Sequence, residues 1–296
     1  MHVEYKVLGP LEVVRDGLLV PVTAPKQRAV LACLLLEANR VVTVDTLVDR
    51  VWDTSPPPGV RNTLQNHVLR LRRTLGCAGR EGPLHTRPQG YLLEVRGPAL
   101  DLARFDLLVR RADAAETAGD WASCAALLTE ALGLWRGPAL ADVPSQTLAR
   151  EAVPVLAERR TQALEKRIRA ELELGGHARV LAELRELTAA HPLHEGFRAQ
   201  HMLALQRAGR PGEALGVYRN ARDILRRESA PSPEPGCATC TAACSPMTPR
   251  RPRRRLPPGP ALLRHLSCRP RRRRSSAARS TSPRCGSSCG RPGSSP

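Results

Sequence analysis

The stretch that decides the fold is VRNTLQNHVLRLRRTL, which occupies residues 60–75. Its apolar residues recur at the spacing of a helix with one face on a core, namely Leu64, Val68, Leu71 and Leu75. The opposite face carries only amide and guanidinium groups, from Asn62, Asn66, Arg70 and Arg73. Amides pair with adenine edges, and guanidinium groups pair with guanine edges or phosphates. Because a solvated helix face normally mixes acids with bases, this acid-free face predicts a helix that meets DNA.

The segments on either side of this helix predict a winged helix over residues 1–97. Strands are expected within residues 3–22, 84–87 and 91–95, and helices from Pro25, over 45–52 and over 60–75. Three helices followed by a β-hairpin, the wing, define this fold. Gly90 is expected to allow the tight turn of the hairpin, and Tyr91 to pack on the 60–75 helix.

Residues 101–228 predict an all-α domain built from helical pairs. Gly175 and Gly209 each begin a similar apolar pattern, and their spacing of 34 residues is the period of a tetratricopeptide repeat. Gly119 opens an earlier helix in the same way. We expect residues 101 to about 227 to be helical throughout. The fold class is therefore mainly α, with a small β-sheet and a wing in the first domain only.

The positive charge of the chain is unevenly placed. Of the net +18, residues 229–296 carry +13, from 14 Arg and the single acid Glu234, which leaves only +5 on residues 1–228. Bulk charge is therefore a weak argument for nucleic-acid binding by the folded part. The tail consists largely of Pro, Arg, Ser and Cys without apolar periodicity, and such a segment is expected to be disordered.

A lost base in the gene offers a second account of this tail. Restoring one base just after Glu228, with GC-rich codons, permits ELGAEPGAGLRDLYRRMLTDDPEAP, a turn followed by an amphipathic helix. On this interpretation the cysteines at 237, 240 and 244 are shifted Leu and Arg codons, not zinc ligands. Resequencing codons 226–232 separates a frameshifted tail from a genuine product.

Several motifs resemble those of a known family. NHVLRLRRTL (66–75) and TRPQGYLLEV (86–95) resemble the OmpR/PhoB-type winged helix. DLARFDLLVRRA (101–112) and HPLHEGFRAQHMLALQRAGRPGEALGVYRNAR (191–222) resemble the bacterial transcriptional activation domain. This order of domains resembles that of the Streptomyces antibiotic regulatory protein family. The resemblance implies an activator of secondary-metabolite genes that binds direct repeats in promoter DNA and recruits RNA polymerase holoenzyme. It also implies a dimer or side-by-side protomers on DNA.

Nine side chains are candidates for contact with double-stranded DNA. Those expected to read base edges in the major groove are Asn62, Gln65, Asn66 and Arg70. Those expected to bind phosphates are Lys26, Arg28, Arg72 and Arg73. Arg87, on the wing, is expected to reach a minor groove or a phosphate. Leu69 points toward the polar side, where it either touches a thymine methyl group or packs under the wing.

Other classes of function find less support. A helical-repeat scaffold that binds proteins without sequence-specific DNA binding is the main alternative, and the acid-free helix face argues against it. The sequence contains no GxxxxGK[ST] motif and no recognisable catalytic arrangement, so we expect no catalytic residue, no cofactor and no metal. With the DNA-binding domain at the N-terminus and no receiver domain expected before it, a two-component regulator is the less expected interpretation. Without a secretory signal or an apolar run of membrane length, a cytoplasmic, nucleoid-associated protein is expected.

Overall fold

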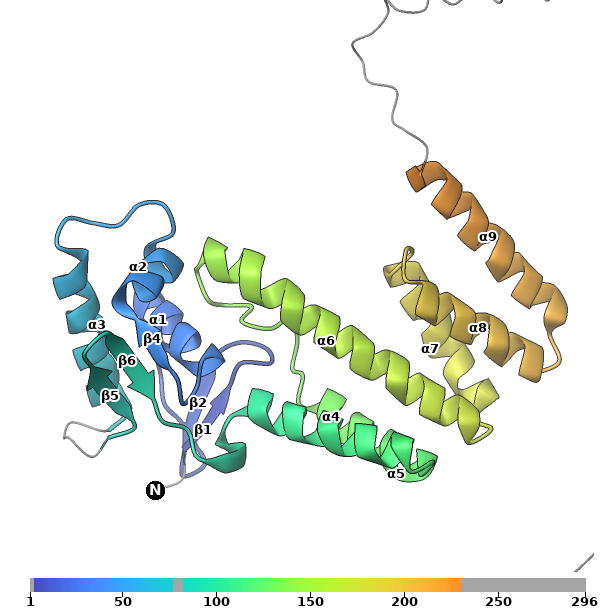
Figure 1. The fold of residues 1–296 in the computed structure, drawn as a ribbon, viewed down its shortest axis with the longest axis horizontal. Coiled ribbons are helices and arrows are strands. Elements are labelled where there is room, and N and C mark those ends of the chain that lie inside the picture. The colour runs from blue at the N-terminus through green and yellow to red at the C-terminus, as the bar shows by residue number, and fades with distance from the viewer. Residues whose placement is uncertain (1–2, 77–81, 230–296) are drawn as a thin grey trace, which may run out of the picture. The chain divides into compact units, whose positions relative to one another are not determined.

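Figure 1 shows the fold in a computed structural model, which describes residues 3–76 and 82–229. These residues belong to one compact unit. The expectations for the tail, namely its disorder, its shifted frame and its cysteine cluster, fall on residues outside those that the structure describes. No helix in the described part of the chain is long and apolar enough to span a membrane.

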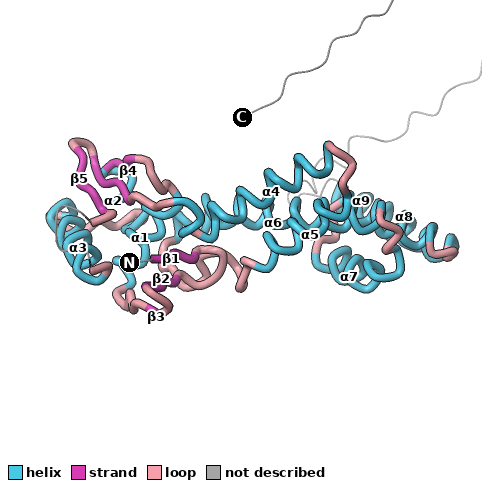
Figure 2. The backbone as a smooth tube through the Cα atoms, turned by 90° about the horizontal axis from the view of Figure 1, so that it is seen from below, coloured by secondary structure: helices cyan, strands magenta, loops and turns pink. Residues whose placement is uncertain are grey.

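The N-terminal part is a winged helix, as predicted. Its elements are β1 (Val3–Lys6), β2 (Glu12–Arg15), β3 (Leu18–Leu19), α1 (Pro25–Leu36), β4 (Val41–Thr43), α2 (Val44–Trp52), α3 (Val60–Thr74), β5 (Leu84–Arg87) and β6 (Gly90–Leu93). They form two three-stranded antiparallel sheets, ordered β1-β2-β3 and β4-β6-β5. Figure 2 shows that the strands gather around α1, α2 and α3, whereas the rest of the described chain is helix and loop.

Helix α3 buries the face that its apolar spacing predicts. Leu64, Val68 and Leu71 are at most 1% exposed, and the helix packs against α1 and α2. Its N-cap, Gly59, has a φ of +67°, a conformation that glycine adopts without steric cost. Arg72 and Arg73 lie in the last turn, where positive side chains interact favourably with the helix dipole.

Gly90 is required for a reason other than the one predicted. A Cβ atom added at Gly90 would lie 1.9 Å from the carbonyl oxygen of Val42 on the neighbouring strand β4. The constraint is therefore the close approach of β4 to β6 and not a tight turn. In this register Gly90 lies opposite Thr43, and Tyr91, which is 6% exposed, lies opposite Val42.

The C-terminal part consists of helical pairs. After the short 3-10 helix η1 (Gly97–Ala99), its helices are α4 (Asp101–Thr117), α5 (Trp121–Gly133), α6 (Gln146–Glu173), α7 (His177–Ala190), α8 (Glu195–Arg207) and α9 (Pro211–Ser229). The turns between α4 and α5, α6 and α7, and α8 and α9 contain Gly119, Gly175 and Gly209, with φ between +74° and +80°. Because these left-handed positions close a helix cheaply, the three glycines predicted the pairing correctly.

The expectation of continuous helix was wrong for residues 134–145. This segment is a loop between α5 and α6, in which Leu140 has a φ of +54°. Part of its backbone bonds to the N-terminal part, since the amides of Arg136 and Leu140 donate to the carbonyl groups of Leu8 and Val7, and the amides of Val143 and Ser145 donate within the segment. The apolar residues that suggested a helix are thus explained by tertiary contacts.

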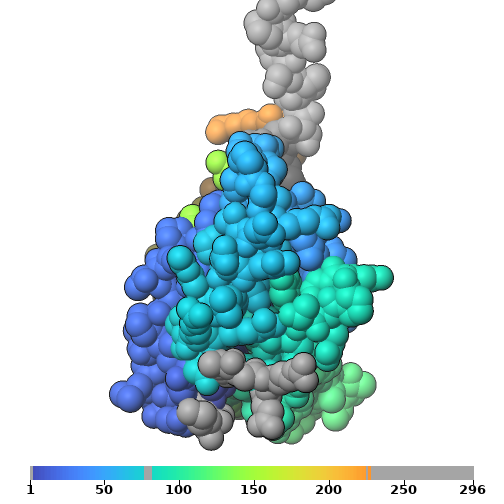
Figure 3. Space-filling model, turned by 90° about the vertical axis from the view of Figure 1, so that its left-hand side faces the viewer, coloured from blue at the N-terminus to red at the C-terminus, as the bar shows by residue number. Residues whose placement is uncertain are grey.

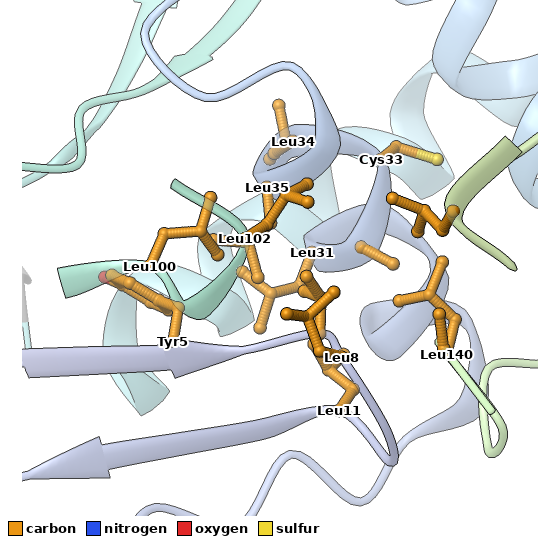
Figure 4. Packing of buried hydrophobic residues seen from close by; sticks show 14 of the residues in the cluster. Tyr5, Leu8, Leu11, Leu31, Cys33, Leu34, Leu35, Leu100, Leu102 and Leu140 are labelled. Carbon is orange, nitrogen blue, oxygen red and sulfur yellow. The ribbon is translucent and has the colours of Figure 1, made fainter. Parts of the chain in front are cut away.

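A single apolar core crosses from the winged helix into the helical part. Figure 4 shows Leu100 and Leu102 beside Tyr5 and near the leucines of α1, and Leu140 on the other side of the cluster, toward Leu8 and Leu11. A smaller separate core joins α6, α7 and α8. We call the contact between the winged helix and residues 100–151 the seam.

Two hydrogen-bonded carboxylates hold the seam together, the buried Asp101 and the half-buried Asp53. The carboxylate of Asp101 accepts hydrogen bonds of 2.9 Å from the backbone amides of Val7 and Leu8 and one of 2.8 Å from its neighbour Leu102. The carboxylate of Asp53 accepts bonds from the amide and hydroxyl groups of Thr147, at 2.8 and 2.7 Å. These carboxylates satisfy backbone donors that an apolar side chain would leave unpaired.

Candidate DNA-binding surface

The polar side chains on the outward face of α3 are all amides or guanidinium groups. The exposed polar members of this face are Asn62, Gln65, Asn66, Arg70 and Arg73. Figure 3 views this end of the molecule and shows α3 in light blue across the middle of the face. The wing hairpin, in green, borders it. The apolar face buried below and the polar face above are the arrangement that the sequence predicts for this helix.

The polar side chains of this face are free to bind a ligand. Within residues 3–76 and 82–229, none of them makes a side-chain hydrogen bond or ion pair. A guanidinium group offers five N–H donors, and an amide offers both donors and acceptors. Leu69 lies among them, is 45% exposed and is not a member of the apolar core.

Arg72 has a partner inside the protein. Its Nε donates to the carbonyl of Leu84 at 3.0 Å, and its Nη2 donates to Oγ1 of Thr86 at 2.8 Å. Both acceptors lie on β5, so Arg72 ties the wing to α3. Arg87, at the end of the same strand, is exposed, and its side chain bonds to no other described residue. The two arginines therefore differ in the structure, because Arg72 bonds within the protein and Arg87 has no bonded partner among the described residues.

The two cations of α1 also bond within the protein. Nζ of Lys26 donates to the carbonyl of Val51 at 2.6 Å and lies 6.0 Å from the ring centre of Trp52. The guanidinium of Arg28 donates to the carbonyl groups of Val22 and Leu11 and to the carboxylate of Asp142. Phosphate binding by Lys26, Arg28 or Arg72 stays a prediction, and it would require these internal bonds to be exchanged.

Two residues near the face were missed in the sequence. Arg61, in the first turn of α3, forms an exposed ion pair of 2.9 Å with Asp45 on α2. His67 lies on the flank of α3, and its ring centre is 6.0 Å from that of Trp52. Burial, followed by the positive charges of Arg70 and Lys26, lowers the pKa of His67 below its usual 6.5. The period of α3 places both on its sides, but their partners come from α2.

The fold and this surface define a class of protein, a winged-helix transcription regulator with a helical-repeat domain. The family described as "Transcriptional regulatory protein, C terminal" matches residues 21–93, and the "Bacterial transcriptional activator domain" matches residues 100–242. The second match continues beyond our expected domain end at 228. Both descriptions agree with the class that the structure defines.

Individual relatives place the chain more closely. Regulatory protein DnrI of Streptomyces peucetius is 38% identical over 78% of this chain and 87% of DnrI. Regulatory protein AfsR of Streptomyces coelicolor is 42% identical over 78% of this chain, which spans only 23% of AfsR. The structure of Mycobacterium tuberculosis EmbR in complex with a low affinity phosphopeptide matches with a TM-score of 0.74 and 35% identity, over 79% of this chain and 62% of that one. The chain belongs to the Streptomyces antibiotic regulatory protein family.

Proposed function

We propose that this chain activates transcription of a secondary-metabolite gene cluster by binding direct repeats in promoter DNA and recruiting RNA polymerase holoenzyme. Its relatives are transcriptional regulators, and DnrI and RedD belong to Streptomyces. The observation that carries the proposal is the exposed face of α3, which has amide and guanidinium groups, no acid and no internal partner among the described residues. It would act on chromosomal DNA in the cytoplasm.

In this proposal the chemistry of each side chain on α3 and the wing decides which part of the DNA it contacts. Those that face base edges in the major groove are Asn62, Gln65, Asn66 and Arg70. Arg73 and Arg87 bind phosphates, which position the protein without specifying sequence. The exposed Leu69 side chain contacts a thymine methyl group. Arg72 acts indirectly, because its bonds to β5 fix the angle between wing and helix.

Direct repeats set the geometry of the protomers. Two copies on a direct repeat have the same orientation, so any contact between them joins different surfaces of the two protomers. The half-sites are then expected about one helical turn apart, roughly 10.5 base pairs, or a multiple of it. Both copies place α3 on the same side of the duplex, with the helical parts free to meet polymerase.

Footprinting on the promoters beside its own gene tests the proposal. We expect protection of two direct repeats, with transcript from a reconstituted polymerase holoenzyme rising when the protein is added. Protection without any rise in transcript would support the proposed DNA binding and contradict the proposed activation. The absence of sequence-specific protection would favour the scaffold alternative, in which the helical pairs bind another protein.

A further inference from the structure

The helices α7, α8 and α9 form a cavity of about 360 Å³. Helix α8 packs against both α7 and α9, and the cavity is lined from all three. Its apolar wall comes from Val217, Ala221 and Ile224 on α9. A volume of this size with an apolar wall and a few polar groups is typical of small-molecule sites.

Arg198 on α8 lines this cavity and is only 7% exposed. Its Nη2 donates to the carbonyl oxygen of Pro192, and no carboxylate lies within 4 Å of it among the side chains that the structure describes. Arg198 is therefore a largely buried cation with no opposite charge beside it, and its side chain borders the pocket. An anion in the cavity would supply that opposite charge.

The charges around Arg198 also favour an anion. Arg185 on α7 lines the same cavity, as does His201, which is 7% exposed and whose Nδ1 has no partner among the described residues. Glu213 is the acid that acts on His201, but both of its carboxylate oxygens accept bonds of 2.6 Å from Arg210. Glu213, the described acid whose charge acts on His201, is therefore already paired with Arg210.

We propose that this cavity binds a small organic anion with an apolar body, such as an acyl or aromatic carboxylic acid. The carboxylate would lie between Arg198 and Arg185, where a guanidinium group donates two parallel hydrogen bonds. The apolar body would lie against Val217, Ala221 and Ile224. The site is independent of the DNA-binding surface, and it makes the helical part a receptor for a metabolite.

Octanoate is a probe of this chemistry, with octan-1-ol and octylamine as controls of the same length. We expect isothermal titration of the full chain to show saturable binding of one octanoate per protein. The alcohol and the amine should bind at least about 10-fold more weakly, since neither carries the negative charge that pairs with a guanidinium group. Comparable affinity for all three would show an apolar pocket without an anion site and would overturn the proposal.

Arg198→Met removes the buried charge and keeps an unbranched, mostly apolar stem. We expect it to weaken octanoate binding about 10- to 100-fold, as the loss of a charge-assisted hydrogen bond implies. Arg207→Met is the matched control, because Arg207 lies on α8 and bonds to the carbonyl of Leu172 and to Glu173, outside the cavity. Its affinity for octanoate should equal that of the unmodified protein.

A second variant keeps the test decisive if Arg198→Met does not fold, which far-UV circular dichroism would show. Ala221→Phe fills the cavity from α9 without replacing a charged residue, and it should abolish octanoate binding. Unchanged affinity in a folded Arg198→Met or in Ala221→Phe would contradict the proposal. Binding of operator DNA serves as a control for fold, and it should be unchanged in both variants.

Discussion

The arginines of the recognition face and those of the protein's internal contacts differ in what surrounds them. Arg70 and Arg73 are exposed on α3 and make no side-chain hydrogen bond or ion pair within the described chain. Arg28 and Arg72 each bond to backbone carbonyls that other elements bring to them. All four lie on helices of the same mildly basic domain. A guanidinium group is therefore available to DNA only where the tertiary fold leaves it without an acceptor.

The largest effect is expected from breaking the seam at Asp101. Asp101→Ala leaves the buried amides of Val7 and Leu8 without an acceptor, and each such loss costs about 1–3 kcal/mol. We expect the free energy of unfolding in urea to fall by about 3 kcal/mol. Operator affinity of the folded fraction should be unchanged, because Asp101 is not on the recognition face. Loss of DNA binding without loss of stability would show that the two regions are not separate in function.

The second effect belongs to the recognition face. Arg70→Ala should weaken operator binding by about 1–3 kcal/mol if Arg70 contacts a base. Its stability should be unchanged, because the side chain is exposed and bonds to nothing within the described residues. Fluorescence anisotropy with labelled operator measures the affinity, and thermal unfolding measures the stability. A lower melting temperature with unchanged affinity would place Arg70 with the structural arginines.

Arg28→Met tests an arginine that bonds within the protein. It removes hydrogen bonds to two carbonyls and to Asp142, and we expect about 1–2 kcal/mol less stability with unchanged operator affinity. Asp142→Asn, which weakens the same contact from the other partner, is the control. If Arg28 instead binds a phosphate, affinity for all DNA falls and the slope of log affinity against log salt decreases by about 1.

The smallest effect concerns His67. Its pKa is below 6.5 in the folded protein, so the unfolded chain takes up the proton first as pH falls. The stability that the neutral ring contributes is complete above pH 6.5 and is lost as pH falls from there toward the lower folded pKa. His67→Gln should therefore lose less stability than the unmodified protein between about pH 7.5 and about pH 5.5. An equal loss of stability between the two pH values in His67→Gln and in the unmodified protein would contradict this assignment.

The sequence predicted those features that depend on local periodicity. The buried and exposed faces of α3 followed from residues 60–75 alone, and the glycine spacing located the helical pairs. What it missed depends on distant partners. Arg28 meets Asp142 across 114 residues, and Gly90 is required by the backbone of β4. The loop at 134–145 looked helical because its apolar residues pack on the winged helix, which no local pattern reveals.

The central claim is that the outward face of α3 distinguishes one DNA sequence from another. The most direct test is the ratio of affinities for the footprinted operator and for a scrambled duplex of equal length, measured for the unmodified protein and for Asn66→Ala with Arg70→Ala. We predict that the double variant loses at least about 10-fold of this ratio while its affinity for the scrambled duplex changes little. An unchanged ratio in a correctly folded double variant would contradict the account.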